Sequence, residues 1–167
     1  GSAQLLASRY LVNRSVMNWH TTDPTIIDVE ASGFGPFSYP LEVGFVKGDG
    51  SRYCALIQPR ADWNHWDEEA AGIHGIRRED LVRLGKPVVQ VASELNQHLD
   101  GETVYSDGWV VDKPWLIRLY EAGGQVMQFT ISPLEMILTE HQMQHWHETK
   151  TTVINELGGL SRHRASV

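Results

Sequence analysis

Short runs of apolar and β-branched residues dominate the early part of the chain, after about residue 20. Runs of this length, bounded by turn residues, are typical of strands. They predict strands over Thr25–Glu30, Pro40–Val46 and Arg52–Gln58. Between the last two strands, the residues Lys-Gly-Asp-Gly at 47–50 are typical of a hairpin turn. We therefore expect three strands in succession, the last two joined as a hairpin.

From about residue 67 onward, helical patterns join the strand patterns. Asp67 is a typical N-cap for a helix that runs towards Gly72, with acidic residues in its first turn. Between Pro87 and Leu99, apolar residues recur at helical spacing. Similar signals predict a strand over Thr103–Ser106, a helix over Asp112–Ala122, a strand over Val126–Ile131 and one or two helices over Pro133–Leu157. Three strands followed by alternating helices and strands predict an α/β layer structure.

The end of the first predicted strand carries two carboxylates two residues apart. Asp28 and Glu30 point to the same face of an extended strand, where their charges repel each other unless something compensates them. Hard oxygen ligands favour Mg²⁺ or Mn²⁺ as the compensating ion. Ser32 and Gly33 then let the backbone turn and approach a ligand. The alternative interpretation is an ordinary solvated strand end.

Three further segments complete a motif set in a fixed order. The segment Ala-Ala-Gly-Ile-His-Gly-Ile occupies positions 70–76, Asp112 opens a predicted helix that continues with Trp115 and Leu116, and His163 lies near the chain end. Together with the Asp-x-Glu strand, these segments resemble the DEDDh family of 3′–5′ exonucleases. That family includes the proofreading subunit of bacterial DNA polymerase III and ribonuclease T. The resemblance covers about residues 25–167.

The resemblance implies an α/β, ribonuclease H-like fold with a central mixed five-stranded sheet flanked by helices. It implies a 3′–5′ exonuclease that releases 5′-mononucleotides from single-stranded nucleic acid by two-metal-ion catalysis, with two divalent cations, Mg²⁺ or Mn²⁺. Asp28 would bridge both ions, Glu30 would bind the ion that activates water, and Asp112 would bind the other. His163 would be the general base, because a histidine pKa of about 6.5 allows proton uptake near neutral pH. Alternatively, it is a surface histidine in a basic tail.

Substrate contacts are expected on both sides of the carboxylates. Ser32, Gly33 and Phe34 follow the Asp-x-Glu strand, where family members place a small polar residue and a hydrophobic wedge, so Phe34 could stack on terminal bases. His74 and Ile76 match the segment that lines the terminal nucleotide. Each of these side chains could instead pack in the core. Among the tryptophans, Trp63 and Trp66 lie in a polar loop and are further candidates for base contact, whereas Trp115 should pack inward behind Asp112.

Two departures from the family pattern affect the carboxylate set. Position 107, five residues before Asp112, is an aspartate where the family often has histidine, and Gly108 follows it. The last aspartate of the pattern would come directly after Val167. We therefore expect residues 21–167 to be a single exonuclease domain that is truncated at its C-terminus. Gly1 and Ser2 resemble the scar of a cleaved tag, so we expect residues 1–20 to be a tag remnant or an N-terminal extension.

Composition and charge narrow the classes of partner. Apolar residues make up 41% of the chain and charged residues 21%, as in ordinary globular domains. The net charge of −7 argues against broad capture of duplex nucleic acid, which needs a basic face. No apolar run is long enough to span a membrane, and the lone Cys54 is consistent with the cytoplasm. The expected partners are 3′ ends of single-stranded DNA or RNA and no membrane, with a homodimer left open.

Two other functions remain open from the residues. One is a catalytically weak or inactive protein with the exonuclease fold, which binds nucleic acid or docks a partner. The other is a zinc site, because His141 and His145 lie one helical turn apart. The zinc-protease order His-Glu-x-x-His is absent from this segment, and a third ligand is not evident, so a solvated helix face is the better interpretation.

Overall fold

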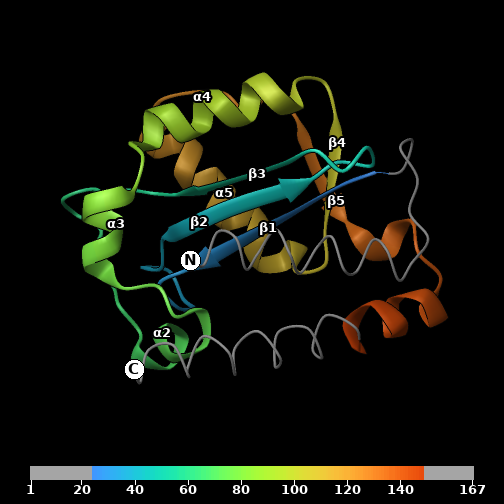
Figure 1. Ribbon diagram of the computed structural model, residues 1–167, viewed down its shortest axis with the longest axis horizontal. Coiled ribbons are helices and arrows are strands. Elements are labelled where there is room, and N and C mark those ends of the chain that lie inside the picture. Colours follow the sequence, from blue (N-terminus) through green and yellow to red (C-terminus); the bar gives the residue numbers. More distant parts are fainter. Residues whose placement is uncertain (1–23, 149–167) are drawn as a thin grey trace.

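The computed structural model describes residues 24–148 of the 167-residue chain. Its centre is a five-stranded mixed sheet with the strand order β3-β2-β1-β4-β5 (Figure 1). The strands β1, β2 and β3 pair antiparallel, whereas β4 lies parallel to β1 and β5 lies parallel to β4. Their bounds are Thr25–Ala31 for β1, Pro40–Val46 for β2, Arg52–Leu56 for β3, Thr103–Ser106 for β4 and Thr130–Pro133 for β5. The predicted mixed five-stranded sheet is confirmed.

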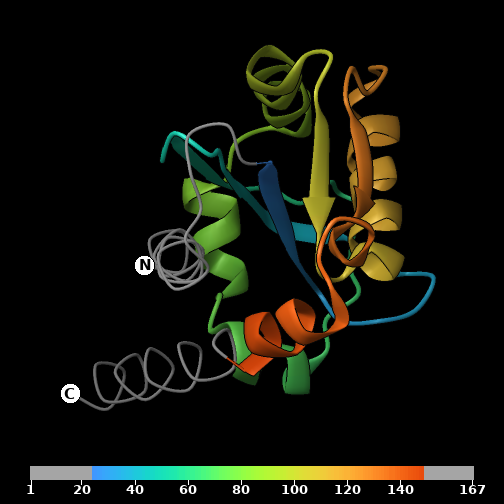
Figure 2. The ribbon, with the colours of Figure 1, turned by 90° about the vertical axis from the view of Figure 1, so that its right-hand side faces the viewer.

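Helices flank this sheet on both sides. The helix α5 contacts β1, β2, β4 and β5, and α4 packs against α5. The helical residues 140–148, red in Figures 1 and 2, lie near the end of β4. The bounds are Glu68–His74 for α2, Arg78–Leu84 for α3, Val88–Leu99 for α4, Trp109–Gly123 for α5 and Leu134–Met136 for the 3-10 helix η1. Within residues 24–148, no helix is long and apolar enough to cross a membrane.

The central strand β1 is buried on both faces because two separate apolar clusters cover it. Ile27 and Val29 belong to the large core, which α4 and α5 complete. Ile26 points the other way and packs with Val46, Leu134 and Trp146 in a smaller cluster. Alternate residues of a strand face opposite sides, so Asp28 shares the face of Ile26. The smaller cluster and the first carboxylate therefore lie on the same side of the sheet.

Several predicted boundaries need correction. The helix capped by Asp67 continues past Gly72 to His74, and ends where Gly75 adopts the left-handed conformation with φ of 69°. The helix predicted from Asp112 begins three residues earlier, because the amide of Asp112 already donates to the carbonyl of Gly108. The fifth strand begins at residue 130 rather than at Val126, which is exposed.

Candidate metal centre

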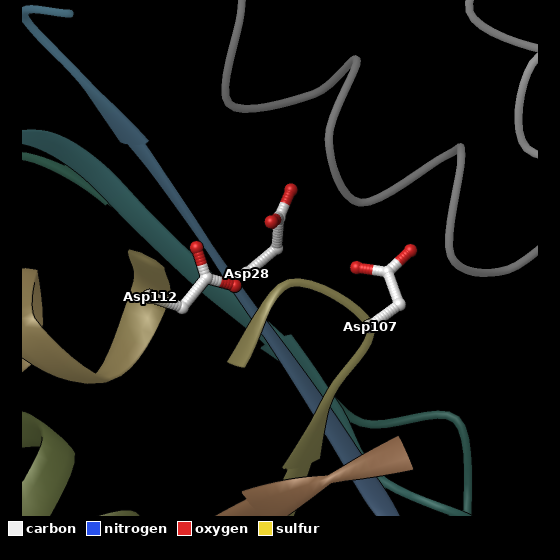
Figure 3. Close-up of side chains that lie close together, drawn as sticks. All are labelled: Asp28, Asp107 and Asp112. Atoms are coloured by element: carbon white, nitrogen blue, oxygen red, sulfur yellow. The ribbon is translucent and has the colours of Figure 1, made fainter. Parts of the chain in front are cut away.

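Three aspartates from different elements converge on one point (Figure 3). Asp28 comes from β1, Asp107 from the turn after β4, and Asp112 from the first turn of α5. Each offers a carboxylate oxygen, and these oxygens all lie within 4.8 Å of one another. Asp28 is only 7% exposed and Asp112 only 2%. The chain therefore gathers three acidic side chains at a largely buried position.

The parallel pairing of β1 with β4 explains why Asp28 and Asp107 meet. Ile26 lies opposite Tyr105 in this pair of strands, and Asp28 and Asp107 each come two residues later. Side chains two residues apart point to the same face, so the two carboxylates project to one side at adjacent positions. Asp107 thus joins the site through the register of β4 on β1, which the spacing of motifs along the sequence does not contain.

Asp112 is held in place by a short hydrogen-bond chain through Ser106. The Ser106 hydroxyl donates to Oδ2 of Asp112 at 2.6 Å and accepts from the amide of Gly108 at 3.0 Å. The N-terminal turn of a helix also favours an acidic side chain, because its backbone amides point outward. Both effects stabilise the ionised carboxylate of Asp112 at the point of convergence.

Asp107 is tied to the last described helical segment. The indole Nε1 of Trp146 donates to Oδ2 of Asp107 at 3.0 Å. Figure 3 shows one oxygen of Asp107 directed towards Asp28 and Asp112. The carboxylate therefore bridges the helical residues 140–148 and the point where the three aspartates converge.

The donor set fits a hard divalent cation. Like charges this close repel, and burial removes the water that would screen them. A divalent ion compensates this repulsion, and carboxylate oxygens are ligands that Mg²⁺ and Mn²⁺ prefer. Within residues 24–148, the three aspartates are the group with this geometry, and the exposed His141 and His145 are not part of one. The arrangement is compatible with metal binding.

Of the other predicted site residues, Glu30 lies on the same face of β1 as Asp28. It is half-buried and pairs across the strands with the buried Glu42. It is not among the three carboxylates within 4.8 Å of one another, and its role as a metal ligand stays a prediction. His163 lies outside the described residues.

Ser32, Gly33 and Phe34 form the start of the turn after β1. The buried Ser32 hydroxyl accepts from the amide of Tyr39 at 3.1 Å and lies 2.8 Å from Nδ1 of His65. Phe34, in contrast, is 73% exposed, and its ring centroid lies 6.0 Å from that of Trp115. Ser32 therefore anchors the turn, whereas the exposed Phe34 ring is accessible to a ligand.

His74 and Ile76 lie at the end of α2. Nδ1 of His74 accepts from the amide of Ile76 at 2.9 Å, and the Ile76 side chain is buried. In the described part of the chain, Nε2 of His74 is buried and has no hydrogen-bond partner. Burial lowers the pKa of the His74 imidazole below its ordinary value. The ring is thus neutral at neutral pH and carries its proton on Nε2.

Trp63 is not available for base contact, so that prediction is wrong. Its side chain is only 3% exposed and stacks on Tyr39, with ring centroids 5.3 Å apart. The polar residues around it suggested an exposed loop, but its indole fills a gap in the core. Trp66 is half-buried and packs edge-on against His74. Trp115 is half-buried and donates through Nε1 to Ser38 at 2.9 Å.

Comparison with solved structures gives a consistent fold. E. coli exonuclease I in complex with a dA16 oligonucleotide superposes with a TM-score of 0.55 at 14% identity, covering 67% of this chain and 28% of that one. Exonuclease I from the moderately thermophilic Methylocaldum szegediense gives a TM-score of 0.54 at 16% identity, covering 68% and 28%. A product-bound exonuclease I gives 0.56 at 14% identity, covering 70% and 31%.

At these identities the likeness shows the fold. This chain spans less than a third of the length of the neighbouring exonucleases. No family model matches the sequence, and no curated protein matches it. Together with the five-stranded mixed sheet and its flanking helices, this likeness shows that the chain has an α/β, ribonuclease H-like fold.

Proposed function

We propose that this protein is a metal-dependent 3′–5′ exonuclease of the DEDDh type, which releases 5′-mononucleotides from single-stranded nucleic acid. The observation that carries the proposal is the convergence of Asp28, Asp107 and Asp112 within the fold of exonuclease I. The solved neighbours include complexes with dA16 and dT13 oligonucleotides, which supports a single-stranded substrate.

The three aspartates are the residues that would hold the metal ions. Glu30 joins them as a further ligand, because it shares the face of Asp28 on β1. Two divalent cations, Mg²⁺ or Mn²⁺, would when bound activate a water molecule and stabilise the charge on the leaving oxygen of the phosphodiester. The all-carboxylate donor set suits these hard cations.

The remaining roles fall to residues around the centre. Ser106 and the first turn of α5 orient the Asp112 carboxylate and favour its negative charge. The exposed Phe34 ring stacks on a base near the 3′ end. His163 is assigned to take the proton from the attacking water as the general base. It lies outside the described residues, so this assignment rests on the motif order alone.

The decisive experiment is a degradation assay with labelled strands. The protein is incubated with 5′-labelled single-stranded DNA and RNA in Mg²⁺, in Mn²⁺ or in EDTA. We expect a ladder that shortens from the 3′ end with either ion and intact strands in EDTA. Strands that stay intact in Mn²⁺ would contradict the proposal and favour an inactive protein that only binds nucleic acid.

Variants of the aspartates separate catalysis from folding. Asp28→Asn and Asp112→Asn each remove a charged ligand but keep the shape of the side chain, and in Asp112→Asn the amide carbonyl can still accept from Ser106. We expect activity to fall by roughly a factor of 100 or more. The metal-free melting temperature should stay equal or rise, because like-charge repulsion is relieved. Asp62→Asn, at an exposed position, is the control that should change neither quantity.

If both aspartate variants fail to fold, the carboxylates are structural and the assignment of the centre is wrong. If they fold and still degrade the strands, the activity arises elsewhere on the protein or from a contaminant.

A further inference from the structure

The indole of Trp146 reaches the metal centre from a segment that contributes none of the three aspartates. Trp146 lies among the helical residues 140–148, is fully buried, and packs with Ile26 and Val46 in the smaller apolar cluster. Its Nε1 donates to Oδ2 of Asp107 at 3.0 Å. The ring therefore lies on the face of β1 that also carries Asp28, with its one polar atom directed at a carboxylate of the centre.

The hydrogen bond between Trp146 and Asp107 has a buried donor and a charged acceptor, unlike a contact on the protein surface. A buried indole N–H needs an acceptor, because a buried donor without a partner loses its hydrogen bond to water and gains none in return. The acceptor here is a carboxylate, and hydrogen bonds to ionised groups are roughly twice as strong as those between neutral groups. The rigid ring is itself held by its burial in the apolar cluster with Ile26, Val46 and Leu134, so it fixes the direction of the carboxylate. The bond thus orients Asp107 without adding a positive charge that would compete with a cation.

We infer that Trp146 is a positioning residue for the metal centre: its indole holds Asp107 in the orientation that binds the divalent cation. The inference rests on the proposed metal centre and goes beyond it, because it connects cation binding to the docking of the helical residues 140–148. Groups that hydrogen-bond to metal ligands usually change metal affinity by about 10- to 100-fold when they are removed.

Thermodynamic coupling makes this connection reciprocal. If the docked indole favours cation binding, the bound cation must favour the docked helix by the same factor. A cation at Asp107 therefore protects the backbone amides of residues 140–148 from hydrogen exchange. The apolar contacts of Trp146 with Ile26 alone do not predict this effect, because they do not involve the carboxylate.

The test compares Trp146→Phe with Trp109→Phe. The first variant keeps an aromatic ring in the apolar cluster and removes only the indole donor. The second makes the same chemical change where Nε1 donates to the carbonyl of Ile131 at 3.1 Å. Calorimetric titration of each 167-residue protein with Mn²⁺ should show affinity weakened by about 10- to 100-fold for Trp146→Phe and unchanged for Trp109→Phe.

Two further readouts separate positioning from simple packing. In the Asp107→Ala background, which has no side-chain acceptor for the indole, Trp146→Phe should weaken Mn²⁺ binding no further, since residues that act through one contact are not additive. Hydrogen exchange of residues 140–148 should slow on addition of Mn²⁺ in the wild type and not in Trp146→Phe. Additive effects, or equal Mn²⁺ affinity of wild type and Trp146→Phe, would overturn the inference. If the wild type itself binds no Mn²⁺, the proposed metal centre fails instead.

Discussion

At the scale of single residues, two carboxylates of the centre accept hydrogen bonds from neutral donors. Ser106 donates to Asp112, and Trp146 donates to Asp107. A neutral donor orients a carboxylate and stabilises its charge without cancelling that charge. The negative potential needed to attract a divalent cation is therefore preserved. Such positioning groups are usually as important to a metal site as the ligands themselves.

His74 gives the pH dependence of stability a definite sign. Burial lowers the pKa of its imidazole from the ordinary value of 6.5. When the pH falls through about 6.5, the unfolded chain takes up a proton at this residue and the folded chain does not, so stability is lost on acidification. The loss continues down to the lowered pKa of the folded state.

We expect His74→Asn to lose less free energy of unfolding than the wild type between about pH 7.5 and about pH 5.5. The Asn carbonyl oxygen can accept from the amide of Ile76, two residues on, as Nδ1 of His74 does. The variant therefore keeps the local turn and lacks the titrating group. Urea denaturation of both proteins at the two pH values measures the difference.

The other histidines occur in both proteins, so their contributions cancel in this comparison. Equal losses of stability on acidification would show that His74 titrates alike in the folded and unfolded chains. A larger loss in the variant would contradict the sign given above.

Motif spacing could identify a site residue only where the residue's own local sequence marks it. Asp28 and Asp112 stand out as an acidic strand end and an acidic helix start, and the structure brings them together. Asp107 could not be assigned in this way, because its place depends on the alignment of β1 with β4, which are far apart in sequence. Trp63 was misjudged for a related reason. Its burial comes from Tyr39, and nothing in the local loop sequence indicates that contact.

At the scale of elements, backbone hydrogen bonds join the turn after β1 to the residue before β2 and to the loop before α2. The amide of Ser32 donates to the carbonyl of Tyr39 at 3.0 Å, and the amide of Asp67 donates to the carbonyl of Ser32 at 2.9 Å. Gly33 follows with a positive φ of 151°. A Cβ built there would lie 2.7 Å from Cβ of Asp67 and 2.9 Å from Cε1 of His65. Only glycine lets the loop before α2 approach the end of β1 so closely.

Gly33→Ala and Gly35→Ala test this close approach as a matched pair. Both glycines have positive φ, so alanine adds backbone strain of about 1–2 kcal/mol at either position. At Gly35 nothing lies within 4 Å of an added Cβ, whereas at Gly33 the clash with Asp67 adds about 1–3 kcal/mol. Urea denaturation should therefore show Gly33→Ala to be the less stable variant by about 1–3 kcal/mol.

Equal destabilisation by the two alanines would mean that the loop at Asp67 moves aside at little cost. In that case the position of the loop relative to β1 would not depend on Gly33.

Elements with an apolar signature could be predicted, and those without one could not. The buried strands β1 and β2 and the amphipathic helix α4 lie where their patterns placed them. The helix α3 was missed because Leu81 is its only buried residue, so its sequence carries no apolar periodicity. The early start of α5 was missed because the turn at Gly108 supplies its first carbonyl acceptor, and Pro114 within the helix obscured the pattern.

At the scale of the whole molecule, the negative net charge of the chain repels the proposed substrate. The chain carries a net charge of −7, and nucleic acid is a polyanion. Aromatic stacking on the exposed Phe34 ring would supply attraction that does not depend on charge. Metal ions at the three aspartates would turn a repulsive site into an attractive one. We therefore expect bound cations, rather than a basic surface, to supply most of the electrostatic attraction.

This balance predicts cation-dependent binding of oligonucleotides. Ca²⁺ is a hard cation that binds carboxylate oxygens, so it should raise the affinity for a labelled single-stranded DNA by tenfold or more relative to EDTA. Tenfold corresponds to about 1.4 kcal/mol, less than the roughly 4 kcal/mol that one charge pair supplies near a protein surface. Asp28→Asn should lose most of the gain and Asp62→Asn should keep it. Fluorescence anisotropy at constant ionic strength measures each affinity. If the wild type binds the labelled DNA equally well in EDTA and in Ca²⁺, charge repulsion at the aspartates does not control substrate binding.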